Sequence, residues 1–190
     1  MKKIEYPQWA SRPYGDYTYS DYLSWGQEVR VELVDGMVYL MAGAGTGHQR
    51  LAGDVYVQLR DFLKDKNCEA FIAPLDVRLQ PKENLSDKTV VQPDILVVCD
   101  KAKINEHSVN GAPDFIVEIM SLHSRAHDIL TKKELYEAAK VREYWVVDKV
   151  KDYVLYKWVL QGGFFTEEKI PLACKTEIPV GIFEGCVISL

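Results

Sequence analysis

Two strand-like runs, each carrying a single carboxylate, constrain the fold of this chain most strongly. Val90–Cys99 contains Asp94 among valines, leucine and isoleucine, and Pro113–Met120 contains Glu118 in a nearly continuous apolar stretch. Continuous apolar residues are typical of a strand that is covered on both faces of its sheet. Pro93 is tolerated near the start of the first run. We therefore expect both runs in one sheet with other elements packed against it.

The segments before these runs show a hairpin and an amphipathic helix. Val29–Met41 consists of two β-rich runs joined at Asp35-Gly36, which is the strongest short hairpin signal. In His48–Lys64 the apolar residues recur every three or four positions, which predicts a helix with one buried face. Ser20 is the expected N-cap of a short helix around residues 21–27.

The remaining segments alternate between strands and one more helix. Glu69–Leu79 and Glu143–Asp148 have strand character, and residues 125–140 read as a helix. Tyr153–Leu160 and the last twenty residues are expected to be edge strands. The helix should turn four residues inward: Ile129, Leu135, Tyr136 and Ala139. The order predicts an α/β (α+β) fold in which helices flank one mixed β-sheet.

Length and charge narrow the class of protein. The 190 residues predict one domain, 1–190, and 23 basic against 28 acidic residues exclude a generally basic surface for nucleic acid. Only residues 120–160 carry an excess of basic residues, 8 against 6. The four cysteines are far apart without a CxxC pair, so neither a zinc ribbon nor a disulfide scaffold is expected. Without a signal segment or an apolar run of about 20 residues, we expect a soluble cytoplasmic protein and no membrane contact.

The carboxylates of Asp94 and Glu118 need a partner if both strands are buried, because an uncompensated buried charge is costly. Two carboxylates with water are ligands that a hard ion such as Mg²⁺ prefers. The alternatives are that one or both face solvent at a strand end, or that they pair with Arg or Lys.

Lys132 lies on the apolar side of the predicted helix, since Ile129, Leu135 and Tyr136 are its neighbours at three or four residues. From there its long side chain can reach the two carboxylates. It can equally extend to the rim of the core, as lysines often do, or pair with Asp128 one turn earlier.

These segments together resemble the Uma-type family, whose members are described as restriction endonucleases of the PD-(D/E)XK nuclease superfamily. The resemblance spans roughly residues 18–160, and single pieces of it carry no weight. It rests on Gln-Pro-Asp94-Ile, Pro113-Asp-Phe-Ile-Val-Glu118-Ile, Ser124-Arg-x-x-Asp128-x-x-x-Lys132-x-x-Leu135-Tyr136, Glu143-Tyr-Trp-Val-Val-Asp148, Glu32-Leu-Val-Asp-Gly36 and His48.

The resemblance implies a restriction-endonuclease-like core and a Mg²⁺-dependent (or Mn²⁺-dependent) endonuclease that acts on DNA. It assigns Asp94 and Glu118 as metal ligands, Lys132 as the cation near the attacking water, and Glu32 as an upstream acid that supports the site. The superfamily pattern has lysine two residues after the second acid, where this chain has Met120; the helix lysine would replace it. A homodimer would suit a chain with no separate target-recognition domain.

Other candidates rank lower. His48 can be a proton shuttle or a phosphate contact, although solvation at the helix start is the simpler interpretation. Gly43–Gly47 lacks the Lys-Ser/Thr of a P-loop, and no G-x-S-x-G elbow accompanies the possible nucleophiles Ser121, His123 and Ser124. The aromatic residues Tyr144, Trp145 and Tyr156 can stack on bases but are more often core residues. Two rival functions stay open: a catalytically silent binding or regulatory domain, and a hydrolase of another phosphate ester.

Overall fold

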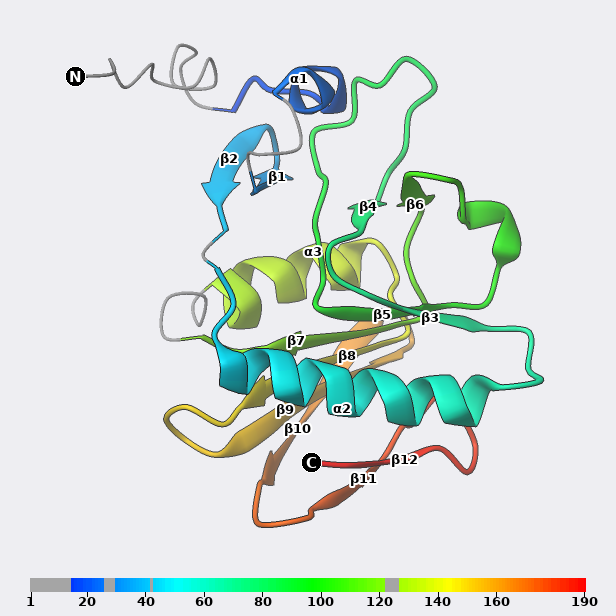
Figure 1. Ribbon diagram of the computed structural model, residues 1–190. Helices are drawn as coiled ribbons and strands as arrows, with labels where there is room; N and C mark the ends of the chain where they lie inside the picture. Colours follow the sequence, from blue (N-terminus) through cyan, green and yellow to red (C-terminus); the bar gives the residue numbers. More distant parts are fainter. Residues whose placement is uncertain (1–14, 26–29, 42, 122–126) are drawn as a thin grey trace.

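The computed structural model describes residues 15–25, 30–41, 43–121 and 127–190. A six-stranded mixed sheet forms its centre, in the order β10-β9-β8-β7-β5-β3, and only β7 and β8 run parallel (Figure 1). The strands of this sheet are β3 (Glu69–Ile72), β5 (Ile95–Val98), β7 (Phe115–Ile119), β8 (Glu143–Asp148), β9 (Val154–Gln161) and β10 (Phe164–Pro171). This is the mixed sheet flanked by helices that the sequence predicts.

Both faces of the sheet are covered. On one face, α2 (Thr46–Leu63) packs with the C-terminal pair β11 (Glu177–Pro179) and β12 (Val187–Ser189) over a core that includes Val97, Val117 and Trp145. On the other face lie the helical segments η3 (His127–Lys132) and α3 (Lys133–Ala138), above a core that includes Leu96 and Ile116. Neighbouring residues of β5 and β7 therefore face opposite cores, as expected for strands buried on both sides.

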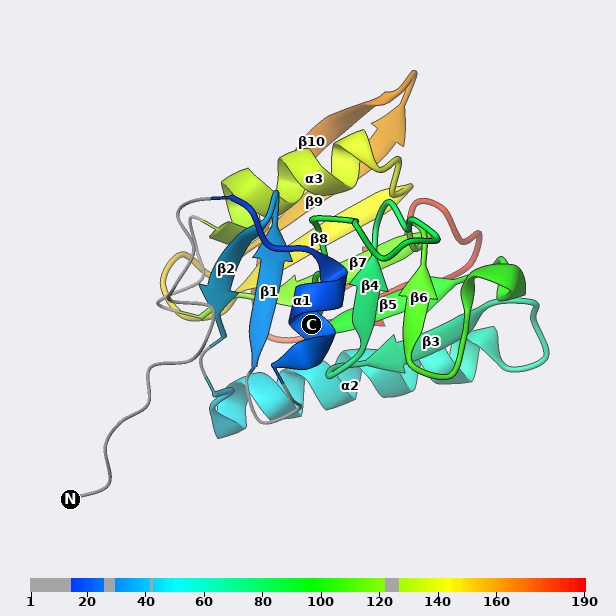
Figure 2. The ribbon, with the colours of Figure 1, turned by 90° about the horizontal axis from the view of Figure 1, so that it is seen from above.

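Smaller elements gather on the α3 side. The hairpin of β1 (Val31–Val34) and β2 (Met37–Leu40), helix α1 (Tyr19–Ser24), and the parallel pair β4 (Asp76–Arg78) and β6 (Ser108–Asn110) lie side by side there (Figure 2). The short helix η2 (Lys101–Lys103) precedes β6. Asp35 and Gly36 both have positive φ, 50° and 79°, as the predicted two-residue hairpin turn requires.

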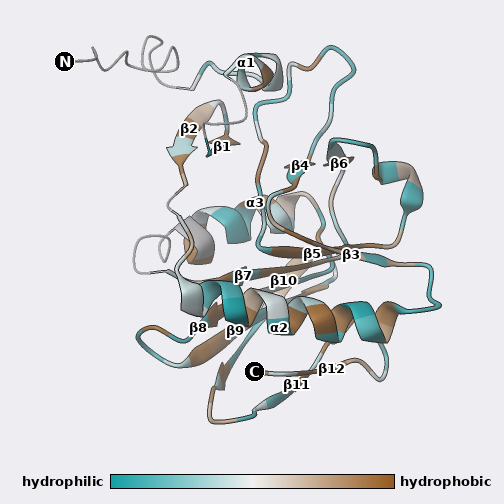
Figure 3. Ribbon diagram, viewed as in Figure 1, coloured by the Kyte–Doolittle hydropathy of each residue, from teal (hydrophilic) through white to brown (hydrophobic). Residues whose placement is uncertain are grey.

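The hydropathy pattern explains which elements are buried. Hydrophobic residues concentrate along the central strands, whereas α2 carries hydrophobic and hydrophilic residues in alternation along its length (Figure 3). The buried residues of α2 are Ala52, Val55, Leu59 and Leu63, which recur at helical spacing. Four residues of the helical segment 127–138 and its C-cap were predicted to point inward, and all four pack into the core on the α3 side of the sheet: Ile129, Leu135, Tyr136 and Ala139. Within the described ranges, no helix is long and apolar enough to cross a membrane.

Several predicted boundaries were wrong. The short helix starts earlier: Thr18 is its N-cap, its side chain accepts from Asp21 N, and Ser20 is inside the helix. The predicted strand Glu69–Leu79 is split into β3 and β4, which belong to different sheets, on either side of Pro74. Proline has no N–H to give to a ladder, so pairing ends there.

Two further corrections concern strand positions. Val90 and Val91 make isolated bridges to Leu33 and Val77, and the regular ladder of the predicted strand Val90–Cys99 begins only at Ile95, after Pro93. The predicted edge strand at Tyr153–Leu160 is an interior strand, because β10 pairs with β9 and forms the edge instead. The helix at 125–140 is also two segments, a π-helical η3 that ends at Lys132 and the α-helix α3.

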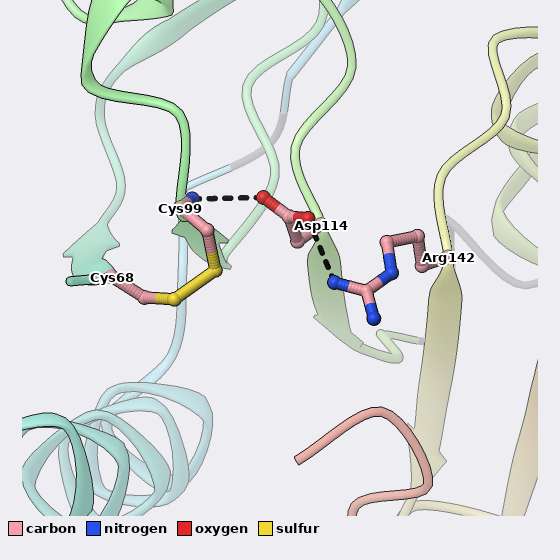
Figure 4. Close-up of a disulfide and its surroundings, with 4 residues drawn as sticks. All are labelled: Cys68, Cys99, Asp114 and Arg142. Atoms are coloured by element: carbon pink, nitrogen blue, oxygen red, sulfur yellow. Dashed lines mark hydrogen bonds and ion pairs between the residues drawn. A yellow bond between two sulfur atoms is a disulfide. The ribbon is translucent and has the colours of Figure 1, made fainter. Parts of the chain in front are cut away.

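A disulfide joins Cys68 and Cys99, where the sequence analysis expected no disulfide framework (Figure 4). The ladder explains it: Glu69 pairs with Val98, so the next residues outward on β3 and β5 face each other. Cys99 N donates to Asp114 Oδ2 (2.8 Å), and Arg142 Nη1 donates to Asp114 Oδ1 (3.1 Å), which ties this end of the sheet together. Cys174 and Cys186 carry free thiols.

Candidate active site

A buried group of three charges lies on the α3 side of the sheet. Lys132 Nζ is 2.8 Å from Glu32 Oε1 and 2.7 Å from Glu118 Oε1, and each of the three side chains is only 4% exposed. The residues come from β1, β7 and the end of η3. Buried charges are tolerated only when they are compensated. Glu118, a carboxylate within a buried strand, is compensated here by the Lys132 ammonium. Lys132 points at the carboxylates and does not extend to solvent.

Hydrogen bonds orient both carboxylates further. The Tyr136 hydroxyl donates to Glu118 Oε1 (3.1 Å), and the backbone N–H of Gln92 donates to Glu32 Oε1 (2.8 Å). Tyr136 follows Lys132 by four residues, so one helical face supplies both partners of Glu118. These contacts leave little rotational freedom to the two side chains.

Gln92 is itself held by a second polar group. Its Nε2 donates to Asp76 Oδ1 (2.8 Å), and Tyr22 OH donates to the same oxygen (2.8 Å). Burial raises the pKa of the Tyr22 hydroxyl, and the charge of Asp76 raises it further, so this tyrosine remains a neutral donor. Helix α1 is thereby connected through Gln92 to the carboxylate of Glu32.

Asp94 lies directly beside this group, opposite Glu118 on the neighbouring strand. Ile95 pairs with Val117, which brings the preceding Asp94 next to Glu118. Asp94 N donates to Glu118 Oε2 (3.2 Å), and Asp94 Oδ2 accepts from Ile119 N (2.8 Å). The same Oδ2 is 3.0 Å from His48 Nε2, and the side chains of Asp94 and His48 are each 18% exposed. The two acids predicted as metal ligands are therefore neighbours on one side of the sheet.

A cavity of about 1010 Å³ opens over these groups. The four predicted site residues Glu32, Asp94, Glu118 and Lys132 all line it, together with His48. Asp94, which is the most exposed of the four, faces this space more than the other three. The site is thus a recess with charged groups at its base, open to an incoming molecule.

The donor set can be tested for a metal ion. Among the described residues, no group of three or more His, Cys, Asp and Glu side chains is arranged to hold one. Lys132 contacts Glu32 Oε1 and Glu118 Oε1. At Asp94, the contacts from Ile119 N and His48 Nε2 are both made to Oδ2. Two carboxylates completed by water fit a Mg²⁺ ion, which retains several waters in most protein sites. Asp94 and Glu118 are accordingly the residues that could hold it.

His48 has a closer connection to the site than the sequence predicts. It is the third residue of α2, and its side chain contacts Asp94, so solvation at the helix start is not its role. Its position after a glycine-rich loop that lines the same cavity was the available signal. Tyr136 was expected as a core residue and as part of a family motif, and Gln92 only as part of the Gln-Pro-Asp94 motif; neither was assigned a role in the site.

The lower-ranked candidate residues lie partly at the cavity and partly in the cores. Ser121 lines the cavity, whereas His123, Ser124 and the side chain of Asp128 lie outside the described residues. The three aromatic candidates, Tyr144, Trp145 and Tyr156, are buried in the two cores, as the simpler interpretation predicts. Lys133 is 4.0 Å from Glu137 on the outer side of the helix and takes no part in the site.

Comparison with known proteins identifies a family, two relatives and a structure with a similar fold. The model of the Uma2 family, described as "Putative restriction endonuclease", matches residues 19–163. A crystal structure from Anabaena variabilis ATCC 29413, described as "a putative nuclease belonging to DUF820", superposes with a TM-score of 0.68 at 16% identity. The superposition covers 86% of this chain and 88% of that one, so the two share a fold.

Two curated relatives come from Synechocystis sp. (strain ATCC 27184 / PCC 6803 / Kazusa). The uncharacterized protein sll1609 is 26% identical over 121 residues, and the uncharacterized protein slr1290 is 25% identical over 128 residues. The matches cover 62% and 66% of this chain, and 66% and 65% of the relatives, just under two thirds of their length. Since the family model spans most of the chain and confirms the predicted resemblance, the chain belongs to the Uma2 family of restriction-endonuclease-type proteins.

Proposed function

We propose that this protein is a Mg²⁺-dependent (or Mn²⁺-dependent) endonuclease that hydrolyses phosphodiester bonds in DNA. The observation that carries the proposal is the buried Lys132 ammonium, which lies 2.7 Å from Glu118 and 2.8 Å from Glu32 beside Asp94 in an open cavity. This arrangement combines acids that suit a hard cation with a fixed positive charge. Phosphoryl transfer needs both kinds of group.

Each residue of the site has a separate role in the proposed reaction. Asp94 and Glu118 would hold the metal ion, which when bound supplies Lewis-acid activation of water and of the phosphoryl group. Lys132 offers a preorganised positive charge to the negative charge that develops on the phosphate oxygens. Glu32 and Tyr136 fix Lys132 and Glu118 in place, and His48 holds Asp94.

Lys132 would substitute for the lysine that the superfamily pattern has two residues after the second acid. Met120 occupies that position and packs into the core beneath α3. Lys132 reaches the same acid from the following helix and is in contact with it. DNA as the substrate rests on the family and on the fold of the neighbour, which is an argument by analogy.

Plasmid cleavage together with metal titration tests the proposal. Wild-type protein should nick or cut supercoiled plasmid in Mg²⁺ or Mn²⁺ and should bind Mn²⁺ in isothermal titration, whereas Asp94→Ala should do neither. Asp61→Ala, an exposed acid of α2, is the matched control and should behave like wild type. Identical metal uptake by wild type and Asp94→Ala would contradict the proposal. A panel of RNA and small phosphodiesters distinguishes DNA from other phosphate esters.

A catalytically silent binding domain is the second candidate. The observation that favours it is the ion pairing within the site, since the Lys132 ammonium contacts both Glu32 and Glu118 and compensates part of their charge. Absence of both Mn²⁺ uptake and cleavage in the wild-type protein would support this candidate. The extent of the nuclease domain over residues 1–190, a homodimer and a cytoplasmic location stay predictions; light scattering tests the homodimer.

A further inference from the structure

Three basic side chains around the cavity have no acidic partner within the described part of the chain. Arg30 precedes β1, Arg50 lies in the first turns of α2, and Lys149 follows β8, and all three line the cavity. Arg30 and Arg50 are exposed, and Lys149 is partly exposed. The cavity is also lined by the acids Glu32, Asp54, Asp94 and Glu118. Since Glu32 and Glu118 contact Lys132, and Asp94 contacts His48, the three unpaired cations are available as contacts for an anion that enters the recess.

Apolar side chains are exposed on the walls of the same cavity. Leu40 at the end of β2 is 69% exposed, and Val150, next to Lys149, is 46% exposed. Met41 and Pro74 line the walls as well. Exposed apolar groups gathered around a recess mark a binding surface, because they gain free energy only when another apolar surface covers them.

The size of the recess limits what can fill it. Its volume of about 1010 Å³ is at the upper end of the roughly 300–1,000 Å³ of sites for small molecules, which is room for more than one nucleotide. Glu32, Glu118 and Lys132 are 4% exposed, so a phosphate must enter the recess to approach them.

From these three features we propose that the site takes a DNA strand whose bases are unpaired, such as single-stranded or splayed DNA. This inference rests on the proposed function and names its substrate. An unpaired strand offers phosphates to Arg30, Arg50 and Lys149 and base faces to Leu40 and Val150. Proteins that bind single strands combine basic side chains along the backbone with side chains that contact the base faces, which are usually aromatic. Here the exposed aliphatic side chains of Leu40 and Val150 would make the contacts with the base faces. In a duplex the base faces are stacked on each other, so the apolar walls would remain uncovered.

Fluorescence anisotropy with a labelled 20-mer tests this inference. In EDTA, where metal-dependent cleavage is absent, the protein should bind the single strand about tenfold more tightly than the duplex of the same sequence. Leu40→Asp and Val150→Asp should remove most of that preference by weakening single-strand binding alone. Val187→Asp, an exposed valine of β12 outside the cavity, is the matched control and should keep it.

The role of the three cations Arg30, Arg50 and Lys149 is tested by the affinity for DNA and its salt dependence. Arg50→Ala should weaken binding of both DNA forms and reduce the salt dependence, whereas Lys175→Ala, an exposed lysine away from the cavity, should change neither. Equal affinity for single strand and duplex, or an equal loss in the wall variants and in Val187→Asp, would overturn the inference. Thermal melting of each variant shows whether it is folded.

Cleavage of the same two substrates in Mg²⁺ separates this inference from the proposed function. Faster cutting of the single strand supports both. Equal cutting of both forms overturns the inference and leaves the nuclease intact. A single-strand preference in binding without cleavage of either form supports the inference as a binding property and contradicts the nuclease.

Discussion

Replacing Lys132 by methionine should destabilise the folded protein strongly. The substitution keeps an unbranched side chain of similar length but removes the cation from between Glu32 and Glu118, whose side chains are 4% exposed. Removing one partner of a buried ion pair costs about 3–5 kcal/mol, because the remaining charge is left without compensation. For a chain of this size that corresponds to a fall in Tm of about 6–20 °C. Urea or thermal unfolding followed by circular dichroism measures it.

Lys133→Met is the control for that experiment. The Lys133 ammonium is 4.0 Å from Glu137, and the Lys133 side chain is 32% exposed. The substitution should therefore lower the free energy of unfolding by at most about 1 kcal/mol. The pH gives an independent check. Without the cation, two buried carboxylates repel each other without compensation, so Lys132→Met should be least destabilised at low pH, where carboxylates bind protons, and should lose stability as the pH rises. Equal stability of the two variants at pH 7 would refute the account of the buried charges.

Three further predictions concern the acids and the cysteines. Glu118→Gln should abolish cleavage and weaken Mn²⁺ binding in isothermal titration, since a neutral amide is a poor ligand for a hard cation; retained cleavage would remove Glu118 from the mechanism. Reduction of Cys68–Cys99, which closes a loop of 31 residues, should lower the unfolding free energy by about 3–4 kcal/mol, measured by urea unfolding with and without reductant; an unchanged midpoint would contradict this. Burial, with Glu143 nearby, raises the pKa of Cys186 to about 11, so at pH 8 a thiol reagent should label exposed Cys174 and spare Cys186 until the protein unfolds; equal rates would contradict this.

Local pattern predicted most of the elements and the acids of the site. Asp94 and Glu118 were recognisable because a carboxylate in an apolar strand requires a partner, and Lys132 because its neighbours at helical spacing are apolar. The hairpin at Asp35-Gly36 was predictable because few other residues accept positive φ at both turn positions.

Features that depend on strand order could not be predicted in the same way. The disulfide forms because β3 lies next to β5, and no spacing in the sequence shows that pairing. The contact of His48 with Asp94 depends on how the start of α2 sits over the sheet. Gln92 contacts Glu32 through its backbone N–H, which every residue but proline possesses, so the residue type does not indicate this contact.

Diffraction from a crystal soaked in MnCl₂ tests the central claim most directly. The account predicts an anomalous peak in the cavity, in direct contact with one carboxylate oxygen each of Asp94 and Glu118, with Lys132 still in contact with Glu118. A fully soaked crystal with no peak there, or with manganese bound only at other carboxylates, would contradict it.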